Sequence, residues 1–418
     1  MSKPGGVAIA PSPSSVILMV AGEASGDLHG GNLAREILVR QPGAQIFGIG
    51  GARMQEAGVH LLHSIDDLAV VGIFEVVLHW RAIRQTFRSL CQFIREKRPD
   101  LVILIDYPDF NLRLAKIARR EHIKVLYYIS PQVWAWRSWR IKTIARNVNT
   151  LLVVFPFEIP LYQGSGLDVR FIGHPLMDIV QAEAACRAEA ACQSVSGRRE
   201  DIRRQLGVDP KRPVIGLLPG SRRSEIARLL PQLLGAAGKL SRQQPDLQFL
   251  LALASTIQPA EVEPYLREID PSVTIHCRTN STYDIIRAAD LVLVSSGTAT
   301  LETALLNTPM ILVYRLSLIS YVLGRMLIRV PYIGLVNLVA EKKIVPELIQ
   351  YQANPETIAS LAMDILKDHK RQERMREELR KIRDKLGEPG SSGRAAEVVM
   401  EILGSNPQGK YLGMRGEN

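Results

Sequence analysis

Cysteine is scarce in this sequence, and the cysteines present are not arranged as ligands. The four are Cys91, Cys186, Cys192 and Cys277. None lies in a Cys-x-x-Cys pair or at a Cys/His spacing typical of zinc sites, so the sequence predicts neither a zinc site nor a disulfide framework. This cysteine usage indicates a protein of the reducing cytoplasm.

Long apolar runs are also missing. Residues 1–16 lack the apolar core and cleavage site of a secretory signal, and we expect a loose leader before the first strand. The longest apolar region, residues 316–340, is interrupted by Arg325, Arg329 and Pro331. A membrane-spanning helix needs about 20 mostly apolar residues. We therefore expect no spanning helix, and contact with a membrane only from its side.

Two familiar nucleotide motifs are absent. The first loop, AGEASGD from Ala21, has no Gly-x-Gly-x-x-Gly pattern, and its carboxylates at Glu23 and Asp27 would repel phosphates. We assign this loop to sugar hydroxyls or to the structure of a cleft. No Asp-x-Asp pair follows a strand in a position to hold a metal-bridged diphosphate. A departing diphosphate is thus expected to be stabilised by helix ends and arginine, without a metal or other cofactor.

The sequence does contain enough apolar residues for two folded domains. Its 418 residues are 46% hydrophobic, and the formal net charge is +10. A chain of this length exceeds one compact core. The positive charge suits nucleic acid, anionic lipid or phosphorylated substrates, and it does not choose among them.

Short β-rich runs alternate with amphipathic stretches, such as the helix expected at Leu28–Arg40, in both halves of the chain. This alternation predicts an α/β fold of two Rossmann-like, doubly wound domains that face a cleft. The expected strands are Val16–Val20, Gln45–Ile49, Leu101–Ile105, Val125–Ile129, Leu151–Phe155, Val214–Leu218, Gln248–Ala252, Val273–Ile275, Leu291–Val294 and Met310–Tyr314.

The domain boundaries follow from changes in composition. Residues 1–180 form the first expected domain, and 181–200, rich in alanine and charge, form a helical linker or insertion. Residues 201–384 form the second domain. The region from Pro355 to Leu403 is expected to be largely helical, and 404–418 form a polar tail.

Two loops of the second half are candidates for a phosphate site. The first loop contains Ser296, Gly297 and Thr298, which follow a strand and begin a helix. The exposed amides and the dipole of that helix favour an anion. Glu302, within the first turns, could accept hydrogen bonds from a ribose. A plain capped helix with a surface glutamate explains this segment equally well. The second loop adds Arg222, whose guanidinium matches phosphate oxygens. The candidate residues are Ser221, Arg222, Ser296, Gly297, Thr298 and Glu302.

Asp106 is the candidate base. It ends a strongly apolar strand, where a doubly wound fold presents catalytic groups, and a partly desolvated carboxylate there could accept a proton from a sugar hydroxyl. Asp109, in the same turn, better suits a structural role. Asn111 is expected to cap the following helix.

Aromatic and basic residues gather in the first half. Trp134, Trp136 and Trp139 cannot all be core residues of so short and arginine-rich a segment, and Arg137 and Arg140 would meet phosphate or anionic headgroups. Arg81, Arg84 and Arg88 share one helix face beside the apolar run Val70–Leu78, which is typical of a peripheral membrane site. RNA binding would use similar residues, and a solvated helix face is the plainer alternative.

Taken together, the motifs resemble those of the lipid-A-disaccharide synthases from about Val16 to Leu403. They are AGEASGD, GIGGARM, DLAVVGIFEV, IDYPDFN, SPQVWAWR, FPFE, FIGHPL, LLPGSR, SSGTATLE, LVNL and VPELIQ. The resemblance implies a GT-B glycosyltransferase with inversion. Its substrates would be UDP-2,3-diacylglucosamine and 2,3-diacylglucosamine 1-phosphate, and its products the β-1,6-linked disaccharide 1-phosphate and UDP.

The resemblance also assigns roles to residues. Asp106 would be the base on the acceptor 6-hydroxyl, with Glu23 near it in the cleft. Arg222, Ser296, Gly297, Thr298 and Glu302 would bind UDP, and Asn337, Glu347 and Gln350 would face the donor. His174 would lie near the hinge between the domains. Helices at about 385–405 would return to the first domain, where a homodimer could exchange them. The protein would be peripheral on the cytoplasmic face of the inner membrane and would not bind nucleic acid.

Departures from the family pattern are modest. The stretch Cys186–Arg199 is longer than the usual linker, and Tyr107 and Gln132 occupy positions that vary. Acyl-chain preference stays open. The alternatives are another UDP-hexosamine GT-B enzyme, namely the peptidoglycan GlcNAc transferase or a UDP-GlcNAc 2-epimerase, and a non-catalytic module that binds RNA or membrane.

Overall fold

The computed structural model describes residues 15–65, 73–131, 133, 139–182, 195–254, 256–270, 273–317, 321 and 330–404. The chain divides into two compact units, each described by itself. The first comprises Met1–Pro175 and Glu388–Asn418, and the second comprises Leu176–Gly387. Sequence composition places these divisions near 180 and 385. Residues 183–194 of the expected linker lie outside the described residues.

The first unit contains a seven-stranded parallel sheet, in the order β3-β2-β1-β4-β5-β6-β7 within the described residues. Its strands are β1 Val16–Ala21, β2 Gln45–Gly50, β3 His60–Ser64, β4 Leu101–Ile105, β5 Lys124–Tyr128, β6 Thr150–Val153 and β7 Asp168–Phe171. The strand order reverses between β1 and β4, which pair in register from Ile17 opposite Leu101 to Ala21 opposite Ile105. This reversal is the topological switch point, where doubly wound folds bind ligands.

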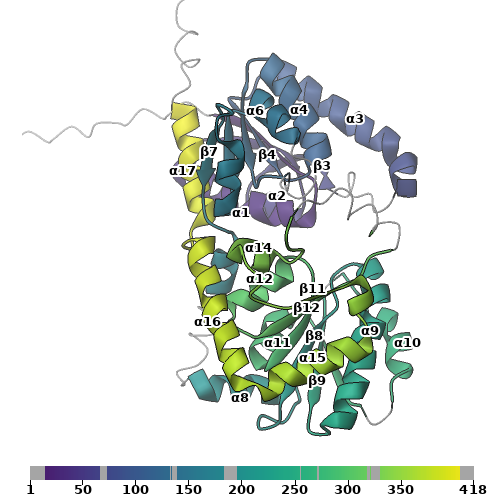
Figure 1. Cartoon of the computed structure of the whole chain (residues 1–418). Coiled ribbons are helices and arrows are strands. Elements are labelled where there is room, and N and C mark those ends of the chain that lie inside the picture. The colour runs from purple at the N-terminus through teal and green to yellow at the C-terminus, as the bar shows by residue number, and fades with distance from the viewer. Residues whose placement is uncertain are drawn as a thin grey trace, which may run out of the picture. The chain divides into compact units, whose positions relative to one another are not determined.

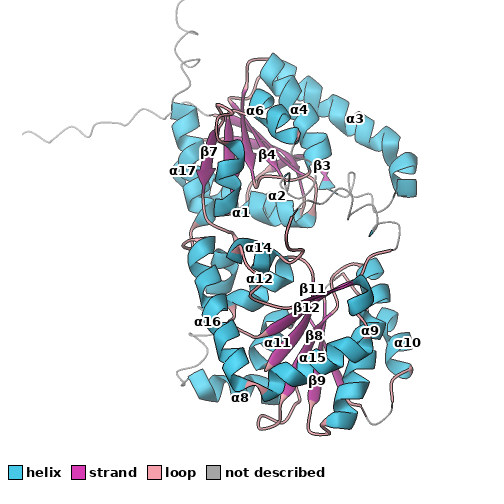
Figure 2. Cartoon of the chain, viewed as in Figure 1, coloured by secondary structure: helices cyan, strands magenta, loops and turns pink. Residues whose placement is uncertain are grey.

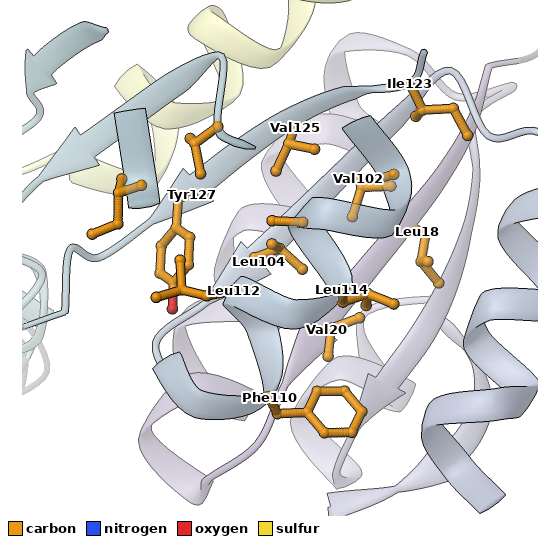
Figure 3. Packing of buried hydrophobic residues seen from close by; sticks show 14 of the residues in the cluster. Leu18, Val20, Val102, Leu104, Phe110, Leu112, Leu114, Ile123, Val125 and Tyr127 are labelled. Carbon is orange, nitrogen blue, oxygen red and sulfur yellow. The ribbon is translucent and has the colours of Figure 1, made fainter. Parts of the chain in front are cut away.

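Helices cover both faces of this sheet (Figures 1 and 2). They are α1 Ala24–Arg40, α2 Ala52–Glu56, α3 Ile73–Lys97, α4 Pro108–Arg120, α6 Arg140–Asn147, the 3-10 helix η2 Pro156–Tyr162, and α17 Ser391–Gly404. Helices α3, α4 and α6 pack against alternate strand residues such as Leu18, Val102 and Tyr127 in one buried cluster (Figure 3). Since both faces are covered, central strands such as β1 and β4 are apolar throughout, without alternation.

Helix α17 follows the second unit in the chain but packs in the first. It contacts α1 and β5, and Lys124 Nζ donates a 3.3 Å hydrogen bond to the carbonyl of Ile402. Arg394 Nε donates to the carbonyl of Ile172 at 2.8 Å, and Arg170 pairs with Glu401 at 2.6 Å. The expected return of the C-terminal region to the first domain is therefore confirmed for α17.

The second unit contains a six-stranded parallel sheet, in the order β10-β9-β8-β11-β12-β13 within the described residues. Its strands are β8 Val214–Leu218, β9 Gln248–Leu253, β10 Ile275–Thr279, β11 Leu291–Ser295, β12 Met310–Tyr314 and β13 Glu347–Ile349. Its helices are α8 Val195–Gln205, α9 Arg223–Gln243, α10 Pro259–Arg267, α11 Thr282–Ala288, α12 Thr298–Leu305, α14 Leu335–Ala340, the 3-10 helix η3 Gln350–Gln352, α15 Pro355–Lys367 and α16 His369–Leu386. Here the strand order reverses between β8 and β11.

Two parallel-sheet α/β units confirm the predicted fold class, with local differences. Helix α1 begins at Ala24, four residues before the expected start, so the last four residues of the AGEASGD loop are helical. Strand β10 begins at Ile275, where the expected strand ends. The short strands β3, β7 and β13 were not predicted. None of the described helices is long and apolar enough to cross a membrane.

Candidate functional site

The first unit places Glu23 and Asp106 at its switch point. Glu23 follows β1 and is the N-cap residue of α1, and Asp106 directly follows β4, the paired neighbour of β1. Both loops lie at the carboxyl edge of the sheet because the two strands are parallel. The structure therefore brings together Asp106, the candidate base, and Glu23, which the resemblance places near it.

The pKa of the Asp106 carboxyl is raised to about 6. Burial is the largest cause, because desolvation disfavours the charged form. The nearby negative charge of Glu23 raises the pKa further, and a hydrogen bond from the main-chain N–H of Tyr107 opposes both effects. At neutral pH this carboxyl is ionised and basic enough to accept a proton from a bound hydroxyl.

Packing between Gly22 and Tyr107 explains why the two loops lie so close. A Cβ atom added at Gly22 would lie 2.3 Å from Cγ of Tyr107, so the tyrosine ring covers this glycine. Only glycine leaves room for the ring. Gly22 of the AGEASGD loop thus lets the segment carrying Glu23 approach the turn carrying Asp106.

Asp27 and Asn111 have structural roles in the same region. Asp27 Oδ1 accepts hydrogen bonds from the amides of Gly51 at 2.6 Å and Met54 at 3.0 Å, and thereby caps α2. The sequence predicted that Asn111 caps α4, and this prediction is wrong because Asn111 lies inside the helix. Its Nδ2 instead donates to the carbonyls of Ile105 and Asp106 at 3.1 and 2.8 Å.

The second unit contains a pocket of about 360 Å³ at its own switch point. The loops after β8 and β11 form it, with contributions from β9 and α11. Six of the predicted UDP-binding residues line it, namely Ser221, Arg222, Ser296, Gly297, Thr298 and Glu302. The structure therefore brings together the six candidate residues of the two predicted phosphate loops.

The loop after β8 is closed by a carboxylate that the sequence analysis overlooked. Glu225 Oε2 accepts hydrogen bonds from the amides of Ser221 at 3.0 Å and Arg222 at 3.3 Å. A Cβ atom at Gly220, whose φ is +115°, would lie 2.3 Å from the same oxygen. The three-residue spacing from Arg222 to Glu225 is that of a capping box and could have revealed this contact.

Arg222 and Arg223 have different surroundings. The Arg223 guanidinium pairs with Glu261 of α10 at 2.7 Å. Arg222 lies 3.9 Å from Glu225, and its side chain is 75% exposed. With its amide bonded to Glu225, Arg222 offers a phosphate its side chain rather than its main chain. Of the two arginines, Arg222 is the one whose guanidinium can bind an anion in the pocket.

The loop after β11 presents the start of α12 to the pocket. Gly297 is the N-cap residue, with a φ of +144° that favours glycine. The first amides of a helix have no partner within the helix, so those of Thr298 and Ala299 can donate to an anion. Ser296 Oγ donates to the carbonyl of Ile333 at 3.3 Å. These contacts orient the loop while its amides remain suited to a phosphate.

Glu302 lies one turn further along α12. Its Oε1 accepts a 3.3 Å hydrogen bond from the hydroxyl of Tyr283 on α11. Burial raises the pKa of Glu302, and the tyrosine hydrogen bond lowers it. The carboxylate is thus positioned by Tyr283, and it can accept hydrogen bonds from the hydroxyls of a bound sugar.

Asn337, Glu347 and Gln350 are buried and bonded within the protein. Asn337 Nδ2 donates to Glu347 Oε1 at 2.8 Å, and its Oδ1 accepts from the amides of Ile344 and Val345 at 2.8 and 3.0 Å. Glu347 also accepts from the amides of Ile333 and Gly334 at 3.1 and 3.0 Å. The side-chain amide of Gln350 makes two hydrogen bonds to the main chain of Leu316, each 3.1 Å long.

These hydrogen bonds give Asn337, Glu347 and Gln350 a structural role. Glu347 orients the Ile333–Gly334 turn, and the Ile333 carbonyl accepts the hydrogen bond from Ser296 in the pocket. None of the three lines the described pocket. Their direct contact with a donor stays a prediction.

The tryptophan cluster is described only in part, because Trp134, Trp136 and Arg137 lie outside the described residues. Trp139 is 64% exposed. Arg140 differs from its predicted role, because its side chain is only 8% exposed and pairs with Asp109 of α4. Its guanidinium carbon lies 5.5 Å from the centroid of the Trp139 ring. Arg140 thus supports Trp139 and is not placed to meet a lipid headgroup.

His174 lies one residue before the end of the first unit's main segment, at Pro175. Its ring centroid lies 5.0 Å from that of Phe155. Burial, with a smaller effect of the charge on His29, lowers the pKa of His174 to about 3. The imidazole is therefore neutral at physiological pH and behaves as a packing group.

No described residues form a group of three or more His, Cys, Asp or Glu side chains arranged to hold a metal ion. The first unit contains a basic carboxyl, and the second unit contains a pocket suited to an anion. Such a pair of sites fits the transfer of a group from a phosphorylated donor to a hydroxyl.

Known structures share this fold at low sequence identity. The calicheamicin glycosyltransferase CalG4 matches with a TM-score of 0.57 at 16% identity, covering 94% of this chain and 99% of that one. The UDP-GlcNAc 2-epimerase from Neisseria meningitidis matches with a TM-score of 0.58 at 12% identity, covering 94% of this chain and all of that one (100%). These likenesses show the GT-B fold, and they do not distinguish transferase from epimerase.

Sequence comparison makes that distinction. The family model described as lipid-A-disaccharide synthetase matches residues 17–402. The lipid-A-disaccharide synthase of Geobacter sulfurreducens is 46% identical over 388 residues, covering 93% of this chain and 97% of the relative. The chain therefore belongs to the lipid-A-disaccharide synthase family, and it is a glycosyltransferase of lipid A biosynthesis.

Proposed function

We propose that this enzyme condenses UDP-2,3-diacylglucosamine with 2,3-diacylglucosamine 1-phosphate. The 6-hydroxyl of the acceptor loses its proton to Asp106 while its oxygen forms a bond to C1 of the donor sugar. The bond from C1 to the diphosphate oxygen breaks, and its electron pair leaves with UDP. Attack opposite the departing UDP inverts C1 and gives a β-1,6 linkage.

The raised pKa of Asp106 is the observation on which this proposal depends most. A carboxylate with an ordinary pKa of 3.8 is a weak base, whereas one with a pKa of about 6 matches the proton-transfer task more closely. Burial and the charge of Glu23 produce this change, so Glu23 acts through its charge. An exposed Glu23 next to the base is also available to bind acceptor hydroxyls.

The pocket of the second unit supports departure of UDP without a metal. Arg222 offers its guanidinium, and the first amides of α12 add their partial positive charge. The amides of α12 are fixed by the helix before the substrate binds, and the Arg222 guanidinium lines the same pocket, so both can stabilise charge as it develops on the diphosphate. In this proposal, Glu302 accepts hydrogen bonds from the ribose.

An assay with a chelator tests both the reaction and its metal independence. The purified protein is incubated with the two acylated substrates and excess EDTA, and UDP and disaccharide are quantified. We expect the rate to remain within about twofold of a matched assay with added magnesium. Release of UDP without disaccharide would contradict the transferase reaction. Turnover that requires a divalent ion would contradict the proposed role of Arg222 and α12.

We further propose that the enzyme binds the cytoplasmic face of the inner membrane from the side. Its α3, α4 and α6 form one helical layer, in which neighbouring helices contact each other (Figure 1). The exposed cations of this layer include Arg81, Arg84, Arg88, Arg113, Lys116, Arg119, Arg120, Lys142 and Arg146. Trp139 is exposed beside α6, and tryptophan favours the boundary between water and lipid. This cationic layer suits an anionic membrane, on which the lipid substrates lie.

Charge reversal tests the membrane proposal. The double variant Arg84→Glu/Arg88→Glu is expected to bind vesicles containing phosphatidylglycerol at least tenfold more weakly, since each cation near such a surface contributes about 1 kcal/mol. Lys370→Glu/Arg374→Glu makes the same change in net charge on α16 of the second unit and should bind as the wild type does. Co-sedimentation measures both. Equal losses in the two variants, or preferential binding of RNA, would contradict the proposal.

We also propose a homodimer in which α17 is exchanged between two copies. Exchange would replace the α17 contacts with α1 and β5, including the Arg170–Glu401 ion pair, by identical contacts from the other copy. Light scattering should give the mass of a dimer, and a monomeric mass across the assay concentrations would contradict exchange.

A further inference from the structure

The main chain at Asp106 has an unusual conformation. Asp106 and Tyr107 both have φ values of +46°, in the left-handed region that residues other than glycine rarely adopt. Tyr107 also precedes Pro108, and a residue before proline normally favours an extended conformation. Such strained conformations persist only where the surrounding structure imposes them, and they concentrate at functional sites.

Two buried side chains hold this strained turn. Asn111 Nδ2 donates to the carbonyls of Ile105 and Asp106 at 3.1 and 2.8 Å. The hydroxyl of Tyr127 donates to the same Asp106 carbonyl at 2.5 Å. Both side chains are 0% exposed. The Asp106 carbonyl therefore has two side-chain donors that come from different elements, α4 and β5.

Each donor is fixed by its own packing. Tyr127 lies in the buried cluster between the sheet and α4, together with Leu104 and Leu112 (Figure 3). Asn111 is on α4, whose first turn also carries Asp109. Asp109 pairs with the buried guanidinium of Arg140 at the start of α6. The core and the α4–α6 contact thus determine where the two donors meet the turn.

We propose that Asn111 and Tyr127 are positioning residues that hold Asp106 in its reactive conformation, an inference that rests on the proposed role of Asp106 as the base. By bonding the carbonyl of Asp106, they keep the main chain of residues 105–107 in the left-handed turn. Only this turn places the amide of Tyr107 against the Asp106 carboxyl and the carboxyl beside Glu23. Both side chains are fully buried, so we expect neither to contact the substrates.

Loss of either donor has a specific consequence. The turn can then relax toward an ordinary conformation, and the carboxyl can move toward water. A more hydrated carboxyl has a lower pKa, closer to the ordinary value of 3.8. It is then both a weaker base and a less well-placed one, whereas the donor pocket in the second unit is unchanged.

The test uses Tyr127→Phe and Asn111→Leu in the full-length enzyme, with kcat, KM and UDP affinity measured from pH 4.5 to 8.5. We expect kcat to fall about tenfold for Tyr127→Phe, the effect of one buried hydrogen bond, and further for Asn111→Leu, which loses two. The acid limb of the kcat profile should move below its wild-type midpoint near 6. KM for the donor and UDP affinity should not change.

Tyr162→Phe is the matched control. Tyr162 lies in the same buried cluster, and its hydroxyl lies 3.0 Å from Ser130 Oγ. Removal of this hydroxyl should lower the melting temperature at most slightly and leave the acid limb in place. A shift of the limb in Tyr162→Phe equal to that in Tyr127→Phe would overturn the inference.

Asp106→Asn distinguishes the role of Asp106 as the base from the positioning role of Asn111 and Tyr127. If this variant is nearly inactive and Tyr127→Phe keeps the wild-type acid limb and kcat, the positioning role is wrong and the base assignment stands. If Asp106→Asn retains normal rates, the base assignment itself is wrong. Should Asn111→Leu fail to fold, Tyr127→Phe, which removes a single oxygen, still decides the question.

Discussion

Asp106→Asn is expected to lower kcat by about 10²- to 10⁴-fold, the usual contribution of a positioned general base. Asparagine keeps the size of the side chain but cannot accept the proton of the acceptor hydroxyl. UDP affinity should stay unchanged, because the residues that line the UDP pocket belong to the second unit. Steady-state kinetics and calorimetric titration with UDP measure the two effects separately.

The pH dependence has a definite sign. Wild-type turnover should fall as the pH drops below about 6, since the carboxyl becomes protonated there, and Asp106→Asn should lose this limb. The raised pKa means that the folded state binds this proton more tightly than the unfolded state does. The charged form is then destabilising at neutral pH, so the melting temperature of Asp106→Asn should be unchanged or higher.

Asp109→Asn provides the control from the same turn. Asp109 is exposed, and it pairs with the buried Arg140. This variant should keep kcat within a few-fold of the wild type but melt at a lower temperature, because a buried guanidinium loses its partner. The opposite pattern, with an active Asp106→Asn and an inactive Asp109→Asn, would transfer the role of base to Asp109.

Arg222→Ala is expected to weaken UDP binding by about 10- to 100-fold, the effect of one charge-assisted hydrogen-bonding group. The kcat should fall as well, because the guanidinium also stabilises the charge that develops on the leaving diphosphate. Arg222→Lys should recover only part of the loss, since lysine keeps the charge without the two-pronged geometry. UDP titration and kcat/KM for the donor give the measurement.

Arg223→Ala is its matched control. Arg223 is the next residue in the chain, and its guanidinium is paired with Glu261. UDP affinity should therefore be close to that of the wild type. Unchanged affinity in Arg222→Ala together with a loss in Arg223→Ala would show that the ion pair with Glu261 opens and that the other arginine binds the phosphate.

The two sheets and the two ligand loops could be predicted from sequence because their signals are local. Buried parallel strands such as β4 and β8 are uninterrupted apolar runs, and the structure gives them the predicted bounds. Edge strands are harder to recognise. Strand β10, IHCRT, is polar because it pairs with β9 alone, and its signal is correspondingly weak.

Long-range contacts explain what the sequence could not reveal. Arg140 reads as a surface cation in its basic segment, but its guanidinium is buried and pairs with Asp109, 31 residues earlier in the chain. Tyr127 looks like an ordinary core residue of β5 until its hydroxyl is seen at the Asp106 carbonyl. Asn337 and Glu347 are ten residues apart, and only the fold brings their side chains to 2.8 Å.

The place of α17 in the first unit has a consequence for how the protein is made. The helix buries Ala395, Val399 and Ile402, yet a ribosome synthesises it only after every residue of the second unit. During translation the surface of α1 and β5 that contacts α17 therefore lacks its partner until a segment encoded more than 200 residues after Pro175 is made. The second unit is continuous in the chain, so all of its residues are synthesised before those of the first unit are complete.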